Sequence, residues 1–196
     1  MRRSEIDEQN RYLIRQQRQF RQAADVVCDA WTKFDEAMAI AVVGSVAKRL
    51  WKEIPRFREF RRAGIEVWHE CKDLDMALWI ASLDRLGELR RAKDLALTRA
   101  FEAGTGVSVV GHQVDTFLFE PGSDRYLGRL CYFAQCPRPG KQDCVAPGCG
   151  VVPHLKQHWD FEPREDLIAN VASTMLWRRD QGRLRSALDL PQTIGD

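Results

Sequence analysis

Two aspartates stand at the head of an apolar run in ECKDLDMALWI, residues 70–80. If this run is a strand, Asp73 and Asp75 project from one face, because side chains two residues apart in a strand point the same way. Adjacent carboxylates repel each other unless a positive group lies between them. Mg²⁺ is a common solution, since it takes oxygen ligands from one or two carboxylates and from nucleotide phosphates. The alternative is a solvated strand end beside Lys72.

Two other positions could complete such a site. Gly44 and Ser45 follow the apolar run MAIAVV at an expected strand-to-helix junction. Glycine there permits a close backbone approach, and the free N–H groups of a helix start attract phosphate. Asp115 lies inside a second strand candidate, QVDTFLF, which is an unfavourable place for an unpaired charge. A metal ion shared with the first two aspartates would explain its position.

The elements that must position these residues follow from hydrophobic periodicity. Apolar residues at helical spacing predict one long amphipathic helix over residues 6–33, and MAIAVV predicts a buried strand. A helix is expected after Gly44, with Pro55 kinking it or ending its first part and Gly64 closing it or its continuation. KDLDMALWIA predicts a strand and residues 82–104 a second amphipathic helix. SVVGHQVDTFLFE and RYLGRLCYFAQ predict a hairpin, and a C-terminal helix is expected over about residues 164–188.

Taken in order, VVGSVAKRLW, KDLDMALWI and QVDTFLF resemble the motifs of the nucleotidyltransferase superfamily of the DNA polymerase β type, in particular its minimal members. In that family a Gly-Ser turn opens a helix and holds the triphosphate, a strand with paired aspartates binds metal, and an aspartate on a later strand completes the site. The resemblance covers about residues 37–120. It implies an α/β (α+β) fold with a small mixed sheet flanked by helices. Residues 46–71 form a longer connection than in small members, so we expect an extended helix or an insertion there.

The resemblance also implies roles for individual residues. The carboxylates that would hold Mg²⁺ or Mn²⁺ and carry catalysis are Asp73, Asp75 and Asp115. The residues that would bind the nucleoside triphosphate are Gly44, Ser45 and Lys48. The implied reaction moves a nucleoside monophosphate group to an acceptor while pyrophosphate leaves. Acceptors in the family include small molecules, RNA ends and proteins, the last two also in toxin-antitoxin systems.

Cysteines concentrate in CPRPGKQDCVAPGCGVVP, residues 136–153. A Pro/Gly loop without a core of its own is a segment that a zinc ion can fold, using four sulfur or imidazole ligands. The expected ligands are Cys136, Cys144, Cys149 and His154, with His158 close behind. The alternative is a loop of free thiols. The other three cysteines have apolar neighbours typical of core positions: Cys28, Cys71 and Cys131.

Charge is distributed unevenly along the chain. The net charge of the 196 residues is +2, yet Arg and Lys crowd residues 2–21 and 48–62. Such segments bind RNA through its phosphates, although a basic helix face is also an ordinary solvated surface. Hydrophobic residues make up 44% and charged residues 30%, and the longest apolar run is too short to span a bilayer. The first residues lack the apolar segment of a secretory signal, so we expect a cytoplasmic protein without a membrane partner.

The sequence therefore predicts one domain over residues 1–196, with a core at about 37–135, a Cys-rich loop at 136–153 and a helical segment at 160–190. The expected function is metal-dependent nucleotidyl transfer to an RNA, protein or small-molecule acceptor. A second interpretation is a non-catalytic module on the same fold that binds RNA or a protein and has a zinc-stabilised loop. A third is a structural zinc protein.

Overall fold

A computed structural model describes residues 2–145, 149–156 and 167–193. Its centre is a seven-stranded sheet in the order β7-β6-β5-β4-β1-β8-β9, and a separate hairpin pairs β2 with β3. The strands are β1 (Ala37–Val43), β2 (Lys52–Glu53), β3 (Val67–Trp68), β4 (Leu74–Ile80), β5 (Val114–Phe119), β6 (Tyr126–Leu130), β7 (Leu155–Lys156), β8 (Met175–Arg178) and β9 (Gly182–Arg183). The helices are α1 (Arg3–Trp31), α2 (Gly44–Ala47), α3 (Arg58–Ala63), α4 (Leu86–Glu102) and α5 (Val171–Thr174), with 3₁₀ turns at Gly111–Gln113, Gln142–Val145 and Ala187–Asp189.

The sheet is mixed because one of its central pairs is parallel. β4 and β5 run in the same direction, and α4 makes the crossover between them, as a parallel pair requires. The other pairs in the sheet are antiparallel, including the predicted β5–β6 hairpin. A mixed sheet with flanking helices and a long N-terminal helix was predicted and is confirmed. None of the described helices is long and apolar enough to cross a membrane.

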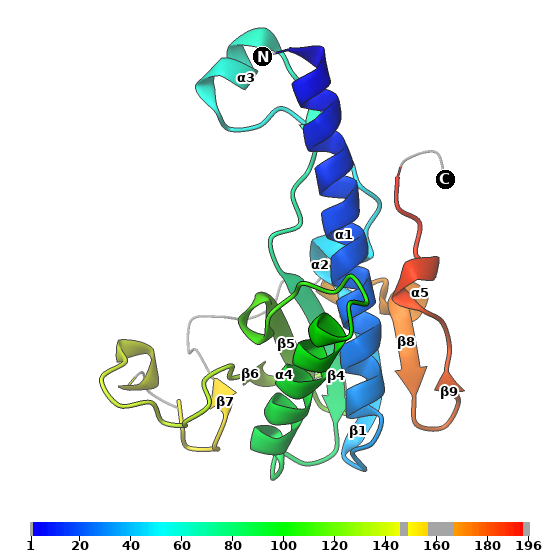
Figure 1. The fold of residues 1–196 in the computed structure, drawn as a ribbon. Coiled ribbons are helices and arrows are strands. Elements are labelled where there is room, and N and C mark those ends of the chain that lie inside the picture. Colours follow the sequence, from blue (N-terminus) through cyan, green and yellow to red (C-terminus); the bar gives the residue numbers. More distant parts are fainter. Residues whose placement is uncertain (1, 146–148, 157–166, 194–196) are drawn as a thin grey trace.

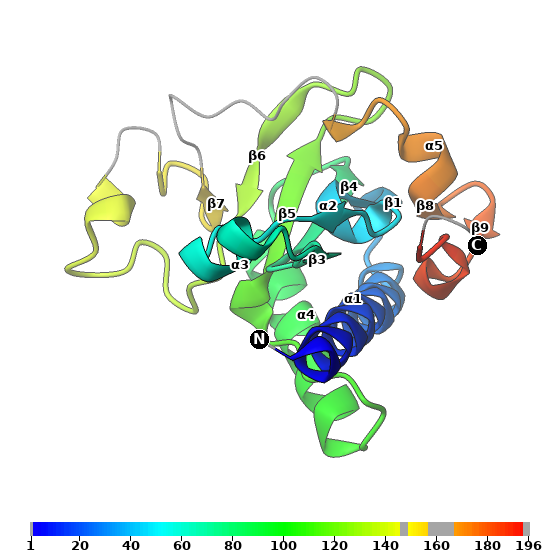
Figure 2. The ribbon, with the colours of Figure 1, turned by 90° about the horizontal axis from the view of Figure 1, so that it is seen from above.

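Helices α1 and α4 cover one face of the sheet (Figure 2). Alternate strand residues such as Ile40, Met76 and Leu118 point to this face and form one core with the apolar sides of the two helices. The indole of Trp31 in α1 joins the helices by donating to the carbonyl of Leu89 in α4 at 3.0 Å. The opposite face of the sheet carries a smaller apolar cluster that includes Trp79.

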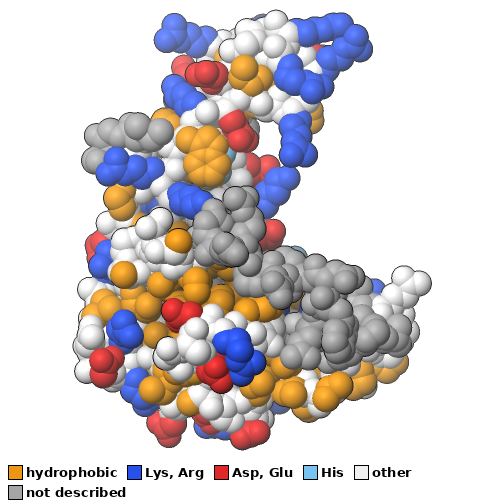
Figure 3. Space-filling view, turned by 180° about the vertical axis from the view of Figure 1, so that it is seen from behind, with side chains coloured by type: hydrophobic (Ala, Val, Ile, Leu, Met, Phe, Trp, Pro, Cys, Tyr) orange, Lys and Arg blue, Asp and Glu red, His pale blue; other side chains and the backbone are white. Residues whose placement is uncertain are grey.

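A projecting arm is built from the start of α1 and the residues that follow α2 (Figure 1). We call residues 3–18 and 48–69 the basic arm, and their Lys and Arg side chains are prominent in Figure 3. The hairpin β2–β3 is tied to α1 because the Trp68 N–H donates to Asn10 Oδ1 at 2.8 Å. Gly64 ends α3 in the left-handed conformation, as predicted, with a φ of 61°.

The long helix predicted after Gly44 is wrong. Helix α2 ends at Ala47, the chain continues in extended form, and α3 is a separate helix of six residues. Leu50 lies in the segment predicted to be helical. Its side chain is instead buried in the core, and its backbone forms a parallel β-bridge with Thr193. A contact so distant in the sequence overrides local periodicity.

The predicted C-terminal helix is also wrong over the residues that the structure describes. From residue 167 onward the chain forms only the four-residue helix α5, followed by the hairpin β8–β9. β8 pairs with the free edge of β1, and it buries Leu176 and Trp177 in the main core and Met175 in the smaller cluster on the opposite face. The beginning of that predicted helix, residues 164–166, lies outside the described residues.

Arg21 connects α1 with both the chain after α2 and the C-terminal segment. Its side chain is only 2% exposed, and its guanidinium donates to the carbonyl groups of Val46, Lys48, Leu190 and Pro191. A buried charge of this kind stabilises a fold only when its hydrogen bonds are satisfied. These bonds therefore fix where the arm leaves the sheet.

We expect Arg21→Met to lower the free energy of unfolding by about 3 kcal/mol, because four carbonyl groups lose a buried donor. Thermal and urea unfolding would measure the change. Arg18→Met, an exposed position on the same helix, is the matched control and should change stability by less than about 0.5 kcal/mol. Equal effects of the two substitutions would contradict this role of Arg21.

Candidate active site

Asp75 and Asp115 lie side by side on the two parallel strands. The register pairs Asp75 of β4 with Asp115 of β5, close to the start of each strand. Their neighbours Leu74 and Val114 point into the core under α1 and α4, so both carboxylates point to the opposite face of the sheet. Strand alternation and register together create this pair from residues 40 positions apart.

The carboxylate of Asp75 is partly buried, and this changes its acidity. Burial, together with the negative charges of Asp115 and Asp73, raises the pKa of Asp75 to about 7. Arg129 acts in the opposite direction on the pKa. Asp73 precedes β4 and is exposed. The three predicted aspartates therefore gather within electrostatic range of one another.

Arg129 was not singled out from the sequence. A nitrogen of its guanidinium lies 3.0 Å from Oδ1 and 3.1 Å from Oδ2 of Asp115. The signal was present in the hairpin, because the register places Arg129 opposite Phe117 and so diagonal to Asp115 on the same face. Arg129 supplies positive charge to a site that would otherwise hold only carboxylates.

Gly44 brings the backbone of the predicted turn directly against Asp75. Its φ of 67° lies in the left-handed region, and β1 pairs Val43 with Asp75. A Cβ at position 44 would lie 3.0 Å from Cγ of Asp75 and would overlap its Oδ2. Only glycine fits this backbone conformation and this space at once. The Gly-Ser turn and the carboxylates therefore share one site.

Ser45 and Lys48 differ in their distance from the carboxylates of Asp75 and Asp115. The Ser45 hydroxyl hydrogen-bonds the thiol of Cys71, whose pKa burial raises to about 11. The side chain of Lys48 is exposed, and its carbonyl accepts a hydrogen bond from Gln17 Nε2 at 2.8 Å. Of the predicted nucleotide-binding residues, Gly44 and Ser45 lie at the carboxylates and Lys48 lies where the chain leaves them.

A buried lysine supports the start of β5 from the helical side. Lys93 of α4 is fully buried, and its ammonium donates to the carbonyl groups of Gly111 at 2.7 Å and Val114 at 3.3 Å. Burial lowers the pKa of Lys93, while the nearby charges of Asp94 and Asp115 raise it. Its place among Leu89 and Leu97 on the apolar face of the helix was a readable signal that the sequence interpretation missed.

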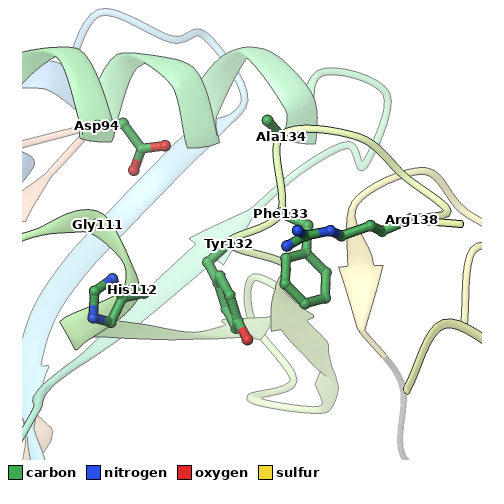
Figure 4. Close-up of a pocket in the computed structure, with 7 residues that line it drawn as sticks. All are labelled: Asp94, Gly111, His112, Tyr132, Phe133, Ala134 and Arg138. Carbon is green, nitrogen blue, oxygen red and sulfur yellow. The ribbon is translucent and has the colours of Figure 1, made fainter. Parts of the chain in front are cut away.

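Two histidines lie close to these elements. His69 is buried and stacks on Trp51 with ring centroids 3.4 Å apart, while its Nε2 lies 3.6 Å from the sulfur of Cys71. His112 lines a pocket of about 490 Å³ between α4 and the chain after β6 (Figure 4). The same pocket is lined by Asp94 and by the Arg138 side chain, which lies over the ring of Phe133.

The cysteine-rich segment is described in part. All six cysteines are free thiols, and His158 lies outside the described residues. One hydrogen bond links two of the predicted zinc ligands, because the His154 backbone N–H donates to Cys136 Sγ at 3.1 Å. Within residues 2–145, 149–156 and 167–193, no three His, Cys, Asp or Glu side chains are arranged as a metal-binding group.

Comparisons with protein-family models, with curated proteins and with solved structures found no match for this chain. The resemblance to nucleotidyltransferases therefore remains a prediction, and the geometry around Asp75 carries the functional argument.

We expect Gly44→Ala to destabilise the chain far more than Gly64→Ala. Both glycines have a φ above 60°, but a Cβ at Gly64 meets no atom within 4 Å, whereas one at Gly44 overlaps Asp75. In both variants, holding alanine in the left-handed conformation should lower the free energy of unfolding by about 1 kcal/mol. In Gly44→Ala the overlap with Asp75 should at least double this loss. Unfolding curves of the two variants give the comparison, and equal losses would show that the turn does not press on Asp75.

We expect Asp75→Asn to stabilise the chain increasingly as the pH rises. The pKa of this carboxyl is raised from 3.8 to about 7 in the folded chain. The protonated Asp75 carboxyl therefore makes its full contribution to folding stability below pH 4, and this contribution is lost as the pH rises through 7. With EDTA present, the variant should gain on the order of 2 kcal/mol over the parent between pH 4 and pH 8.

Melting temperatures at pH 4, 6 and 8 would test this dependence. Asp35→Asn is the control, because the Asp35 side chain is 99% exposed. Asp35 precedes the start of β1, whereas Gly44 follows its end, so Asp35 is far from the candidate site. A difference between Asp75→Asn and the parent that does not change with pH would rule out a perturbed Asp75.

Proposed function

We propose that this chain is a metal-dependent nucleotidyltransferase that moves a nucleoside monophosphate group from a nucleoside triphosphate to an acceptor. The observation that carries the proposal is the pairing of Asp75 with Asp115 in register, directly against the Gly44 turn. The order of turn, paired aspartates and later aspartate matches the order that the sequence resemblance implies. Strands β5, β4 and β1 are neighbours in the sheet, so the turn and the paired carboxylates come from adjacent strands.

The donor atoms fit a hard divalent cation. Asp73, Asp75 and Asp115 offer only carboxylate oxygens, which Mg²⁺ and Mn²⁺ prefer over nitrogen and sulfur ligands. The raised pKa of Asp75 indicates that its carboxylate lacks sufficient positive charge from the protein alone. These three residues would hold the ion, which would supply Lewis-acid stabilisation of phosphate charge when bound.

The remaining residues bind and orient the substrate. The N–H groups of the Gly44-Ser45 turn would donate to phosphate oxygens, and the absence of a Cβ at Gly44 lets phosphate approach the backbone. Helix α2 has only four residues, so these N–H groups and not a helix macrodipole would provide the attraction. Arg129 would orient the carboxylate of Asp115 through its two contacts.

The basic arm favours RNA as the acceptor. The chain leaves the candidate site after Ser45, builds the arm over residues 48–69, and returns just before Asp73. None of the arm's arginines forms an ion pair with another described residue, so their charges remain available to phosphates. Exposed aromatic rings such as Phe57, which is 72% exposed, could stack on unpaired bases.

A second candidate function is a non-catalytic module that binds RNA. The observation in its favour is the ion pair between Arg129 and Asp115, which supplies positive charge to the carboxylates from within the chain. In that case the basic arm would bind RNA without any transfer of nucleotide.

Incubation with each labelled nucleoside triphosphate, Mg²⁺ and total cellular RNA and protein would test the proposed activity. We expect label in RNA with the parent chain and with Asp35→Asn. Asp75→Asn and Asp115→Asn should reduce labelling at least 100-fold while the fold is retained, because each removes a carboxylate that the reaction needs. Full labelling by Asp75→Asn would exclude this site from catalysis, and salt-dependent RNA binding without label would favour the second function.

A further inference from the structure

A pocket of about 490 Å³ lies beside the end of the sheet where β5 begins and β6 ends (Figure 4). In this view Asp94 of α4 and His112 lie on one side of it, Phe133 and Arg138 lie on the other, and Tyr132 lies between them. Its volume is that of a typical small-molecule site. The pocket is distinct from the paired carboxylates, which lie on the sheet face opposite α4.

The carboxylate of Asp94 is an acceptor that the protein leaves partly unused. Its Oδ2 accepts a hydrogen bond from Arg90 at 2.6 Å, whereas its buried Oδ1 accepts none from the described residues. The Lys93 ammonium lies 3.9 Å from Oδ1, beyond hydrogen-bonding distance. A Cβ at Gly111 would overlap Oδ1, so glycine lets the carboxylate lie against the pocket wall. Because 34% of its side chain is exposed, Asp94 can accept N–H groups from a ligand.

Aromatic rings and a guanidinium form the other wall. Tyr132 is 42% exposed, and its ring centroid lies 4.4 Å from that of Phe133. The guanidinium of Arg138 lies over the Phe133 ring, 4.9 Å from its centroid. An exposed ring can stack on a flat heterocycle, and a guanidinium can donate two parallel hydrogen bonds to neighbouring acceptors. The pocket therefore suits a flat ligand with N–H donors on one edge and acceptors on another.

Guanine has this pattern of donors and acceptors. Its N1–H and N2–H₂ groups would donate to the Asp94 carboxylate, while its O6 and N7 would accept from Arg138, the pairing most often used to read this base. Adenine presents an amino group where guanine has O6, and cytosine and uracil lack N7. The Tyr132 ring would stack on the base. Guanine is therefore the base that the pocket fits best.

The position of the pocket indicates which molecule carries the guanine. His112 lies three residues before Asp115, and Tyr132 lies three residues after Arg129, so both pocket walls continue the strands that hold the Asp115–Arg129 ion pair. Three residues of extended chain span about 10 Å. In the sheet order β6-β5-β4-β1, the pocket and the Gly44 turn lie on opposite sides of the paired carboxylates. A triphosphate held at Gly44 would therefore direct its nucleoside round the start of β5 toward the pocket.

We propose that this pocket binds the guanine base of the substrate, which would be GTP. The assignment of the base to the triphosphate rests on the proposed function. The binding of guanine by the pocket does not, because it needs neither a metal ion nor transfer.

Calorimetric titration of the full-length chain with nucleoside monophosphates in EDTA tests the pocket. We expect guanosine monophosphate to bind roughly tenfold or more tightly than those of adenosine, cytidine, uridine and inosine, since inosine lacks the N2–H₂ group that Asp94 would accept. Tyr132→Ser should weaken binding about tenfold through loss of stacking. Arg138→Gln should weaken the guanosine and inosine compounds equally, because both have O6 and N7. Phe101→Ser, at a ring of α4 that is 66% exposed and outside the pocket, is the control and should change nothing.

Equal affinities for the monophosphates would overturn the proposal, and so would unchanged affinity in both Tyr132→Ser and Arg138→Gln. The transfer assay then separates this proposal from the proposed function. Transfer from all four labelled triphosphates at similar rates would overturn the choice of GTP and leave nucleotidyl transfer intact. Selective binding of guanosine monophosphate without transfer from any triphosphate would confirm the guanine pocket and overturn the proposed function.

Discussion

The parallel, in-register pairing of β4 with β5 is the constraint on which the candidate site depends. It places Asp75 opposite Asp115 and, in the same step, turns Leu74 and Val114 toward the core under α1 and α4. Because side chains alternate along a strand, slipping one strand by a single residue would bury its carboxylate under the helices and expose its apolar residues. Packing of the hydrophobic core therefore fixes the positions of the Asp75 and Asp115 carboxylates, and no further interaction is needed to align them.

The charge balance of the site follows from this arrangement. Two carboxylates that the sheet holds together must be compensated by protonation, by a protein cation or by a metal ion. Arg129 forms an ion pair with Asp115, while burial and the negative charges of Asp115 and Asp73 raise the pKa of Asp75 to about 7.

The features that could be predicted from the sequence are those that short-range patterns determine. The strand containing Asp75, the helix that ends near Gly104 and the β5–β6 hairpin follow from periodicity and turn residues. The features that were missed depend on contacts between distant parts of the chain. Leu50 fitted a helix but is buried by a bridge to Thr193, and the last described segment became a hairpin because the edge of β1 was free to pair.

The same distinction applies to the candidate site. Asp75, Asp115 and Gly44 were found because their types are unusual at strand positions and turns. Arg129 was missed because only the register of the β5–β6 hairpin shows that it faces Asp115. Lys93 was missed although its place between Leu89 and Leu97 on the apolar face of a helix is visible in the sequence. Cys28, Cys71 and Cys131 were interpreted as core-type cysteines, and all three are buried.

The basic arm departs from the sheet and returns to it at two points that lie close together, before and after residues 48–69. The length and shape of this excursion are therefore largely decoupled from the register of β1 with β4. Changes in the length or sequence of this excursion would therefore leave the paired carboxylates of Asp75 and Asp115 where they are.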